Sequence, residues 1–418
     1  MTVENELLEC LKDALTPDLT MEELVENGCL ELEKRLQESD TSMLSGGSSI
    51  LPCAPRGEKM GFLHIALDLG GSFVKLGFVN AANLKVSNCA SMAIHAVSVN
   101  VQFFRSIVEW ICEQAAKFLC EREINPSTVI FELGLTFGFP LTPHGQITTM
   151  GKGFQLSDEV KAMKMTVLLQ RLFLETQMKG AYGYEVRVGG IVNDSVAVFL
   201  ANAATEKDND VSLILGTGIN ACFSLPSERI PSRKTPGESG DGAVAQLINS
   251  EIGFLGQDFI KLSEFDPKDE TLFMPLEYVT AGKWIPLTLK NIIFRHNLSS
   301  GAAEHLNFDG KLICDILNGS SIAAFGRDQP VIKALTYALI ERAAFYATGA
   351  LLSMLKFTGD DRPHAVRVGY AGSFLRNCTA YRDLIYQFSA GKIELEFLEH
   401  SNLIGAHVNS LRCHDVGS

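Results

Sequence analysis

The pattern of apolar and polar positions predicts helices and strands that alternate along the chain. Leucines at helical spacing over residues 3–39, broken once by a Pro-Asp pair, predict two amphipathic helices. A Ser-, Gly- and Pro-rich stretch over 40–60 predicts a connecting loop. Further amphipathic helices are expected over 101–120 and 158–179. The longest apolar run, 343–357, is too short and too often interrupted by polar residues to span a membrane, so it predicts a core helix.

Two segments share a strand–turn–strand design in which Leu-x-Leu-Gly opens the turn, which indicates a structural duplication. Residues 62–79 contain a Gly-Gly-Ser turn, and residues 211–225 contain Gly-Thr-Gly. Glycines let a ligand approach the backbone, and turn amides can bind phosphate oxygens. Lys75 would neutralise phosphate charge, and Asp68 would hold Mg²⁺ directly or through water. Plain β-hairpins are the alternative. The candidate phosphate-binding residues are Asp68, Gly70, Gly71, Ser72, Lys75, Gly216, Thr217 and Gly218.

Two other kinds of nucleotide site are excluded. Gly216-x-Gly218-x-x-Ala221 fits a loose dinucleotide-binding pattern, but a second strand follows where that motif requires a helix, and no acidic residue closes a βαβ unit. The sequence also lacks GxxxxGK[ST]. The chain is therefore neither a Rossmann protein nor a P-loop NTPase.

An Asn-Asp pair stands where a strand pattern changes to a helix pattern. The apolar run 185–192 predicts a strand, Asn193 and Asp194 follow it, and a short helix is expected to about Thr205. A carboxylate at the end of a strand is well placed to act on a bound ligand. The alternative is that Asp194 or Ser195 caps the helix, since Asp, Asn and Ser are favoured capping residues.

Other polar residues stand out against their surroundings. Glu251 lies alone in an uncharged Gly-rich segment, and Glu277 lies in another largely uncharged stretch, although either could be a surface glutamate. Lys152 lies between two glycines, which suits either a solvated turn or contact with a ligand. A late strand opens into a glycine turn at Gly372 and Ser373, and such turns commonly bind adenine or ribose.

Composition narrows the class of protein. A chain of 418 residues predicts two domains. A net charge of −13 argues against nucleic acid or an anionic membrane as partner. The ten cysteines form no CxxC pair, which argues against a zinc site and suits a reducing cytosol. The acidic N-terminus lacks an apolar signal region, so a cytoplasmic location is expected.

The ordered motifs over residues 50–412 resemble those of the eukaryotic hexokinases, kinases of the actin-like ATPase superfamily. These motifs are LDLGGS, TFGFP, GKGF, VNDSV, LGTGINACF, INSEIGFLG, LEYVTAGKW and VGYAGSF. The resemblance implies a two-domain α/β, ribonuclease H-like fold with a sugar cleft between the domains. It implies a small domain over 61–193, a large domain formed by 1–60 and 194–402, and a C-terminal helix, 403–418, that returns to the small domain.

The resemblance also assigns roles to single residues. Asp194 resembles the catalytic base that accepts the proton of the sugar 6-hydroxyl. The two phosphate-binding turns resemble the family's ATP elements, with Mg²⁺ held by Asp68 through water, and Gly372 and Ser373 resemble its adenosine element. The residues that match sugar-binding positions are Lys152, Asn193, Asn220, Glu251 and Glu277.

Departures from the hexokinase pattern point to a particular substrate. Gly138 stands where hexokinases usually have Ser, Met150-Gly151 where they have Trp-Thr, and Ile252 where they have Trp. The loss of hydroxyls and bulk should weaken glucose recognition and open space for a larger substituent. The sequence looks most like the fungal N-acetylglucosamine kinases in the motifs GGS, VNDSVAV, LGTGIN, TAGKW, VGYAGS and Asn402-Leu403-Ile404-Gly405-Ala406. This resemblance implies ATP-dependent 6-phosphorylation of that sugar. A glucose or mannose kinase, and a weakly catalytic sugar-sensing regulator favoured by Phe73 and Lys75, are the alternatives. A monomer or homodimer is expected.

Overall fold

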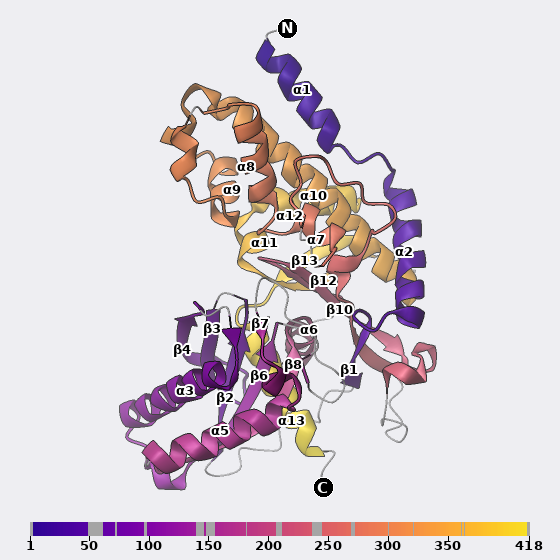
Figure 1. The fold of residues 1–418 in the computed structure, drawn as a ribbon. Coiled ribbons are helices and arrows are strands. Elements are labelled where there is room, and N and C mark those ends of the chain that lie inside the picture. Colours follow the sequence, from indigo (N-terminus) through magenta and orange to yellow (C-terminus); the bar gives the residue numbers. More distant parts are fainter. Residues whose placement is uncertain are drawn as a thin grey trace. The chain divides into compact units, whose positions relative to one another are not determined.

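A computed structural model describes residues 3–48, 62–71, 73–95, 98–138, 146–147, 155–180, 182–205, 211–235, 245–268, 272–299, 301–320, 322–360, 362 and 364–415. The chain divides into two compact units, whose elements are traced in Figure 1. Unit 1 contains residues 1–43, 210–223 and 250–397. Unit 2 contains residues 44–209, 224–249 and 398–418.

Unit 2 is built on a five-stranded sheet with the order β4-β3-β2-β6-β8. β2 pairs antiparallel with β3 and parallel with β6, and β6 pairs parallel with β8. The carboxyl ends of β2, β6 and β8 therefore meet at one edge of the sheet. The strands are β2 (Phe62–Leu69), β3 (Phe73–Val79), β4 (Val86–Ala93), β6 (Ile130–Phe137) and β8 (Glu185–Asn193).

Helices cover both faces of this sheet. Since successive residues of a strand point to opposite faces, neighbouring residues pack against different helices. Ile65 of β2 joins a core with Phe104 of α3 (Val101–Glu121) and Leu168 of α5 (Met165–Gly180). Its neighbour Ala66 instead packs with Ala406 of α13 (Ser401–Asp415). Figure 1 shows α3 and α5 lying together along the sheet.

Glycines set the close packing of α13. A Cβ on Gly134 of β6 would lie 2.2 Å from the backbone oxygen of Ala406, and a Cβ on Gly405 would lie 1.9 Å from that of Ala197 in α6 (Asp194–Ala204). Only residues without a side chain fit at these two contacts. The other elements of unit 2 are β1 (Leu44–Ser48), β5 (Ser98–Val99), η1 (Pro126–Thr128), β7 (Gln155–Leu156), α4 (Asp158–Lys161), η2 (Ser227–Arg229), η3 (Ser232–Lys234) and β11 (Ala245–Asn249).

Unit 1 combines a sheet with a long buried helix. β9 pairs antiparallel with β10 and parallel with β12, which pairs parallel with β13. The helix α10 (Gln329–Thr358) packs against α2 (Met21–Glu38) so closely that a Cβ on Gly349 would lie 2.1 Å from Leu24. The strands are β9 (Val211–Leu215), β10 (Ile219–Pro226, whose last three residues belong to unit 2), β12 (Val366–Ala371) and β13 (Ile393–Phe397).

The remaining helices of unit 1 surround α10 and the sheet. They are α1 (Val3–Leu15), η4 (Ile252–Phe254), α7 (Pro275–Thr280), α8 (Ile285–Arg295), η5 (Ala302–His305), α9 (Gly310–Leu317), η6 (Ala323–Asp328), α11 (Ser373–Asn377) and α12 (Thr379–Phe388). By length and composition, 323–358 is the one helical stretch in the described part that could cross a membrane. Because 78% of its most apolar window is buried within the protein, this is weak evidence, and the expectation of a core helix over 343–357 is confirmed.

Two local predictions are wrong. The expected loop over 40–60 contains β1, which pairs with β11; a Cβ on Gly46 would lie 2.8 Å from Val196, so the glycine lets this strand lie against α6. The expected helix over 158–179 is two helices, α4 and α5. Their break buries both Val160 and Met165, which would point about 140° apart on one straight helix.

The compact units have different bounds from the expected domains. Residues 194–209 belong to unit 2, since α6 packs against α13 and β8. Residues 224–249 also belong to unit 2, where β11 pairs with β1. The C-terminal helix α13 lies in unit 2 against β2, β6 and β8.

Candidate active site

The carboxyl edge of the unit 2 sheet gathers three chain segments around Asp194. Leu69, Phe137 and Asn193 are register partners at the ends of β2, β6 and β8. Gly138 follows β6, and a Cβ placed on it would lie 3.4 Å from Asp194 Oδ2 and 3.8 Å from Gly70 Cα. Ligands of sheets with parallel strands commonly bind at this edge. The first phosphate turn and the candidate base are thus neighbours.

Asn193, rather than Asp194 or Ser195, is the cap of α6. Its Oδ1 accepts hydrogen bonds from the backbone N–H (2.9 Å) and the hydroxyl (2.7 Å) of Ser195. The same N–H also donates to Asp194 Oδ1 at 2.8 Å. Asp194 is the first residue of the helix and is partly buried. The N-terminal end of a helix stabilises a carboxylate, and the bond to Ser195 orients it.

Asp68 is buried inside β2 with a partner for each oxygen. The hydroxyl of Thr136 donates to Oδ1 at 2.9 Å, and the side-chain amide of Asn402 donates to Oδ2 at 3.1 Å. Lys75, an exposed residue of β3, is its cross-strand register partner. Gly70 N–H donates to Phe73 O at 3.1 Å, which closes the first turn.

This arrangement bears on the expected Mg²⁺. Within the described residues no group of three His, Cys, Asp or Glu side chains could hold a metal ion. Asp68 is a single carboxylate whose oxygens each already accept a hydrogen bond. These residues fit an ion whose other ligands are phosphate oxygens and water, which is how Mg²⁺ usually binds with nucleotides.

In unit 1 the second phosphate turn lies against the expected adenosine element. Gly216 N–H donates to Gly218 O at 3.0 Å. A Cβ on Gly216 would lie 3.5 Å from Gly372 Cα, and a Cβ on Gly372 would lie 2.3 Å from Leu215 O. Gly372 has φ +120°, which other residues rarely adopt. The turns that follow the parallel strands β9 and β12 are therefore in contact.

The three sugar-binding candidates of unit 1 are all buried. Asn220 Nδ2 donates to Glu251 Oε1 at 3.3 Å. Glu251 has the left-handed conformation, φ 48° and ψ 49°, which is strained for a non-glycine residue. Glu277 accepts hydrogen bonds from Ile219 N–H at 3.3 Å and from the indole N–H of Trp284 at 3.2 Å.

The structure thus gathers most of the predicted residues into one group in each unit. Lys152 and Ser72 lie outside the described residues. The sequence did not single out three residues that donate hydrogen bonds to the predicted ones: Thr136, Asn402 and Trp284. They lie inside motifs that carry the family resemblance, but no local signal distinguishes a supporting residue from its neighbours. Unit 2 contains Asp68, Gly70, Gly71, Lys75, Asn193 and Asp194, and unit 1 contains Gly216, Thr217, Gly218, Asn220, Glu251, Glu277, Gly372 and Ser373.

Comparison with known proteins gives a consistent answer. Two family models described as hexokinase match residues 6–204 and 210–411. The chain belongs to the hexokinase family. This sugar kinase is 26% identical to N-acetylglucosamine kinase 1 of Candida albicans, over 85% of this chain and 84% of that protein. It is 24% identical to hexokinase-2 of Solanum tuberosum, over 85% and 78% of the two chains.

Solved structures give the same fold. A hexokinase from Schistosoma mansoni complexed with glucose superposes with a TM-score of 0.68 at 19% identity, covering 99% of this chain and all of that one. A second hexokinase structure also gives 0.68, at 17% identity, over 98% and 99% of the two chains. The protein is therefore a sugar phosphotransferase with the two-domain α/β hexokinase fold, and its family implies ATP as phosphoryl donor.

Proposed function

We propose that this hexokinase-family enzyme transfers the terminal phosphoryl group of ATP to the 6-hydroxyl of N-acetylglucosamine. The observation that carries the proposal is Gly138. Hexokinases usually have Ser at this position, whereas here the residue whose Cβ would lie 3.4 Å from Asp194 Oδ2 is a glycine, which has no side chain. The similarity to a fungal N-acetylglucosamine kinase over most of both chains supports the same substrate.

The chemistry follows from the described side chains. The 6-hydroxyl oxygen forms a bond to the terminal phosphorus of ATP, the bond from that phosphorus to ADP breaks, and Asp194 takes the hydroxyl proton. In unit 1, Asn220, Glu251 and Glu277 accept from or donate to the sugar hydroxyls. A site built of such groups rejects a substrate that leaves one of them unpaired.

The glycine turns and Lys75 would bind the phosphates of ATP. Mg²⁺, held through water by Asp68, would supply charge neutralisation on those phosphates. The residues of this chain need only orient the nucleotide and exclude water from the transferring group. The backbone N–H groups of the two turns can bind phosphate oxygens without any side chain having to move.

One feature favours a second function. The phosphate turn carries Phe73, whose side chain is 50% exposed, and Lys75 in place of the family's Arg. Hexokinases usually have Asn and Arg at these two positions of the ATP element, and their replacement suits a sugar-sensing regulator. Turnover at kinase-like rates with Mg-ATP excludes that role.

The test is identification of the product. Purified enzyme is incubated with Mg-ATP and N-acetylglucosamine, and phosphorus-coupled NMR locates the new phosphate. The proposal expects N-acetylglucosamine 6-phosphate and stoichiometric ADP. A product phosphorylated at another hydroxyl, or no product while glucose is phosphorylated under the same conditions, contradicts it.

A further inference from the structure

Glu277 accepts hydrogen bonds from two other places in the sequence of unit 1. It lies on the short helix α7, and its Oε2 accepts the backbone N–H of Ile219, which follows the second phosphate turn. Its Oε1 accepts the indole N–H of Trp284 at 3.2 Å. The carboxylate therefore has one protein donor on each oxygen.

Two glycines let the backbone lie close to the Glu277 side chain. A Cβ on Gly218 would lie 2.5 Å from Glu277 Oε2, and a Cβ on Gly253 would lie 3.4 Å from Glu277 Cβ. The backbone thus approaches Glu277 on two sides. Trp284 supplies the one side-chain donor among the hydrogen bonds described for this carboxylate.

Contacts within unit 1 hold both the ring and the backbone of Trp284. Its side chain is buried, its ring meets that of Tyr278 edge-on at 4.9 Å, and Lys283 Nζ lies 4.3 Å from the ring centroid. Both the N–H (2.9 Å) and the hydroxyl (3.2 Å) of Thr288 donate to the backbone oxygen of Trp284. The ring and the backbone of Trp284 are therefore both fixed by contacts within unit 1.

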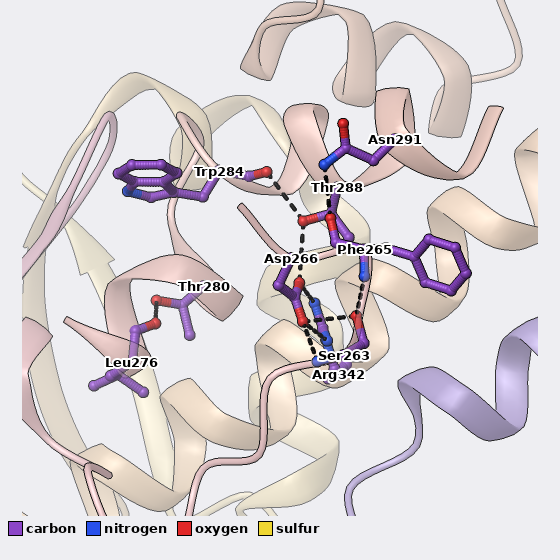
Figure 2. Close-up of polar contacts among 9 residues, drawn as sticks. All are labelled: Ser263, Phe265, Asp266, Leu276, Thr280, Trp284, Thr288, Asn291 and Arg342. Carbon is purple, nitrogen blue, oxygen red and sulfur yellow. Dashed lines mark hydrogen bonds and ion pairs between the residues drawn. The ribbon is translucent and has the colours of Figure 1, made fainter. Parts of the chain in front are cut away.

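A buried ion pair completes this support, as Figure 2 shows. The single hydroxyl proton of Thr288 is shared between the backbone oxygen of Trp284 and Asp266 Oδ1, which lies 3.1 Å from the hydroxyl oxygen. Arg342 of α10 donates to both oxygens of Asp266 at 2.6 and 2.8 Å. Burial alone would raise the pKa of Asp266, but the charge of Arg342 and hydrogen bonds from Arg342 and Ser263 outweigh it and lower the pKa. Contacts thus run unbroken from α10 to Trp284.

We infer that Trp284 is a positioning residue for sugar binding: its indole N–H fixes the orientation in which Glu277 accepts the hydroxyls of the sugar. The inference rests on the proposed role of Glu277 as a sugar ligand. A carboxylate offers about four lone-pair sites. Ile219 and Trp284 use one lone-pair site on each oxygen of Glu277, so the remaining sites face a fixed direction. The Glu277 side chain therefore loses little conformational entropy when the sugar binds.

The first experiment compares Trp284→Phe with Trp110→Phe. Phenylalanine keeps an aromatic ring but lacks the N–H. The chain has only two tryptophans, and Trp110 lies partly buried on α3 of unit 2, so it controls for the chemical change. We expect KM for the sugar to rise about five- to thirtyfold in Trp284→Phe, the cost of a hydrogen bond to a charged group, with kcat within about threefold. Trp110→Phe should change neither.

A double-mutant cycle with Glu277→Gln tests whether Trp284 acts through Glu277. In the Gln background, Trp284→Phe should raise KM less than twofold further, because the charged carboxylate that Trp284 orients toward the sugar has been replaced by a neutral amide. Trp110→Phe should remain additive. A purely structural tryptophan would instead lower thermal stability and the active fraction, and its effect on KM would be the same in both backgrounds.

The outcomes separate this inference from the proposed substrate. The cycle is measured on whichever sugar the enzyme phosphorylates best, since Glu277 is proposed to bind ring hydroxyls and not the N-acetyl group. A preference for glucose of about tenfold or more in kcat/KM overturns the proposed substrate and leaves this test in force. An unchanged KM in Trp284→Phe, or full additivity with Glu277→Gln, overturns the role of Trp284.

Discussion

The two units hold their candidate site carboxylates in different ways. In unit 2, Asp68 lies within β2 and Asp194 follows β8, so the parallel sheet itself sets their positions. In unit 1, Glu251 stands in a strained turn and Glu277 on a short helix, and both depend on side-chain and backbone donors from elsewhere in the sequence. Asp68 also accepts hydrogen bonds from Thr136 and Asn402, but its place in the chain is set by its strand. The difference teaches that the proposed chemistry in unit 2 rests mainly on strand order, while the proposed sugar recognition in unit 1 rests mainly on a network of contacts.

The largest effect should come from the base of unit 2. Asp194→Ala removes the proton acceptor, so kcat should fall on the order of 10²–10⁴-fold while sugar affinity, measured by calorimetry, changes little. The unit 1 variant Glu277→Gln should show the opposite split, with affinity reduced more than kcat. If Asp194→Ala turns over at the wild-type rate, Asp194 is not the base.

The buried ion pair of unit 1 should give the next largest effect. Arg342 is 3% exposed, and Arg342→Met leaves Asp266 as an unpaired buried charge, which should lower the free energy of unfolding by about 3–5 kcal/mol. The matched control is Arg295→Met, whose exposed pair with Glu264 should contribute about 1 kcal/mol or less. Urea titrations measure both. Equal losses in the two variants would show that the pair does not support unit 1.

Acid should unfold unit 2 before unit 1. Burial, aided by the neighbouring His64, lowers the pKa of His407 of α13 to about 3 from 6.5. A lowered folded pKa means that the unfolded chain binds the proton more tightly, so this stability is present above about pH 6.5 and is lost as pH falls toward 3. His64 on β2 and its register partner Glu132 on β6 are the titratable groups beside it. In unit 1, the pKa of Asp266 is lowered from its ordinary value of 3.8, so the stability that it contributes is lost only as the pH falls below about 3.8.

The two tryptophans separate these transitions. Trp284→Phe leaves Trp110 to report unit 2, and Trp110→Phe leaves Trp284 to report unit 1. Fluorescence during acid titration should change first for Trp110. His407→Leu should move the Trp110 transition to lower pH, whereas the exposed His305 changed to Leu should not. Coincident transitions in both single-tryptophan proteins would contradict this order.

The smallest effect concerns substrate choice. A Cβ on Gly138 would make only an ordinary contact with Asp194 at 3.4 Å, so Gly138→Ser should fold normally. The added hydroxyl restores the usual hexokinase residue and narrows the space, and we expect kcat/KM for N-acetylglucosamine relative to glucose to fall about three- to tenfold. Glucose serves as the internal control. A ratio that rises would show that Gly138 does not favour the larger sugar.

How much of this could be predicted from sequence also differs between the units. Asp194 was predicted at the end of β8 because an apolar strand pattern followed by a helix pattern is a local signal. Neither the conformation of Glu251 nor the bond from Trp284 to Glu277 has such a signal, since each depends on how distant segments pack. The same reason explains the missed strand β1, which exists only through its pairing with β11. The sequence showed that Gly138 differs from the usual hexokinase residue, but it could not show that Gly138 lies next to Asp194.

The proposed substrate is tested most directly by competition. N-acetylglucosamine and glucose are mixed at equal concentration with Mg-ATP and limiting enzyme, and mass spectrometry counts the two sugar phosphates at early times. The product ratio equals the ratio of the kcat/KM values. We predict an excess of N-acetylglucosamine 6-phosphate. An excess of glucose 6-phosphate of about tenfold or more would contradict the proposal.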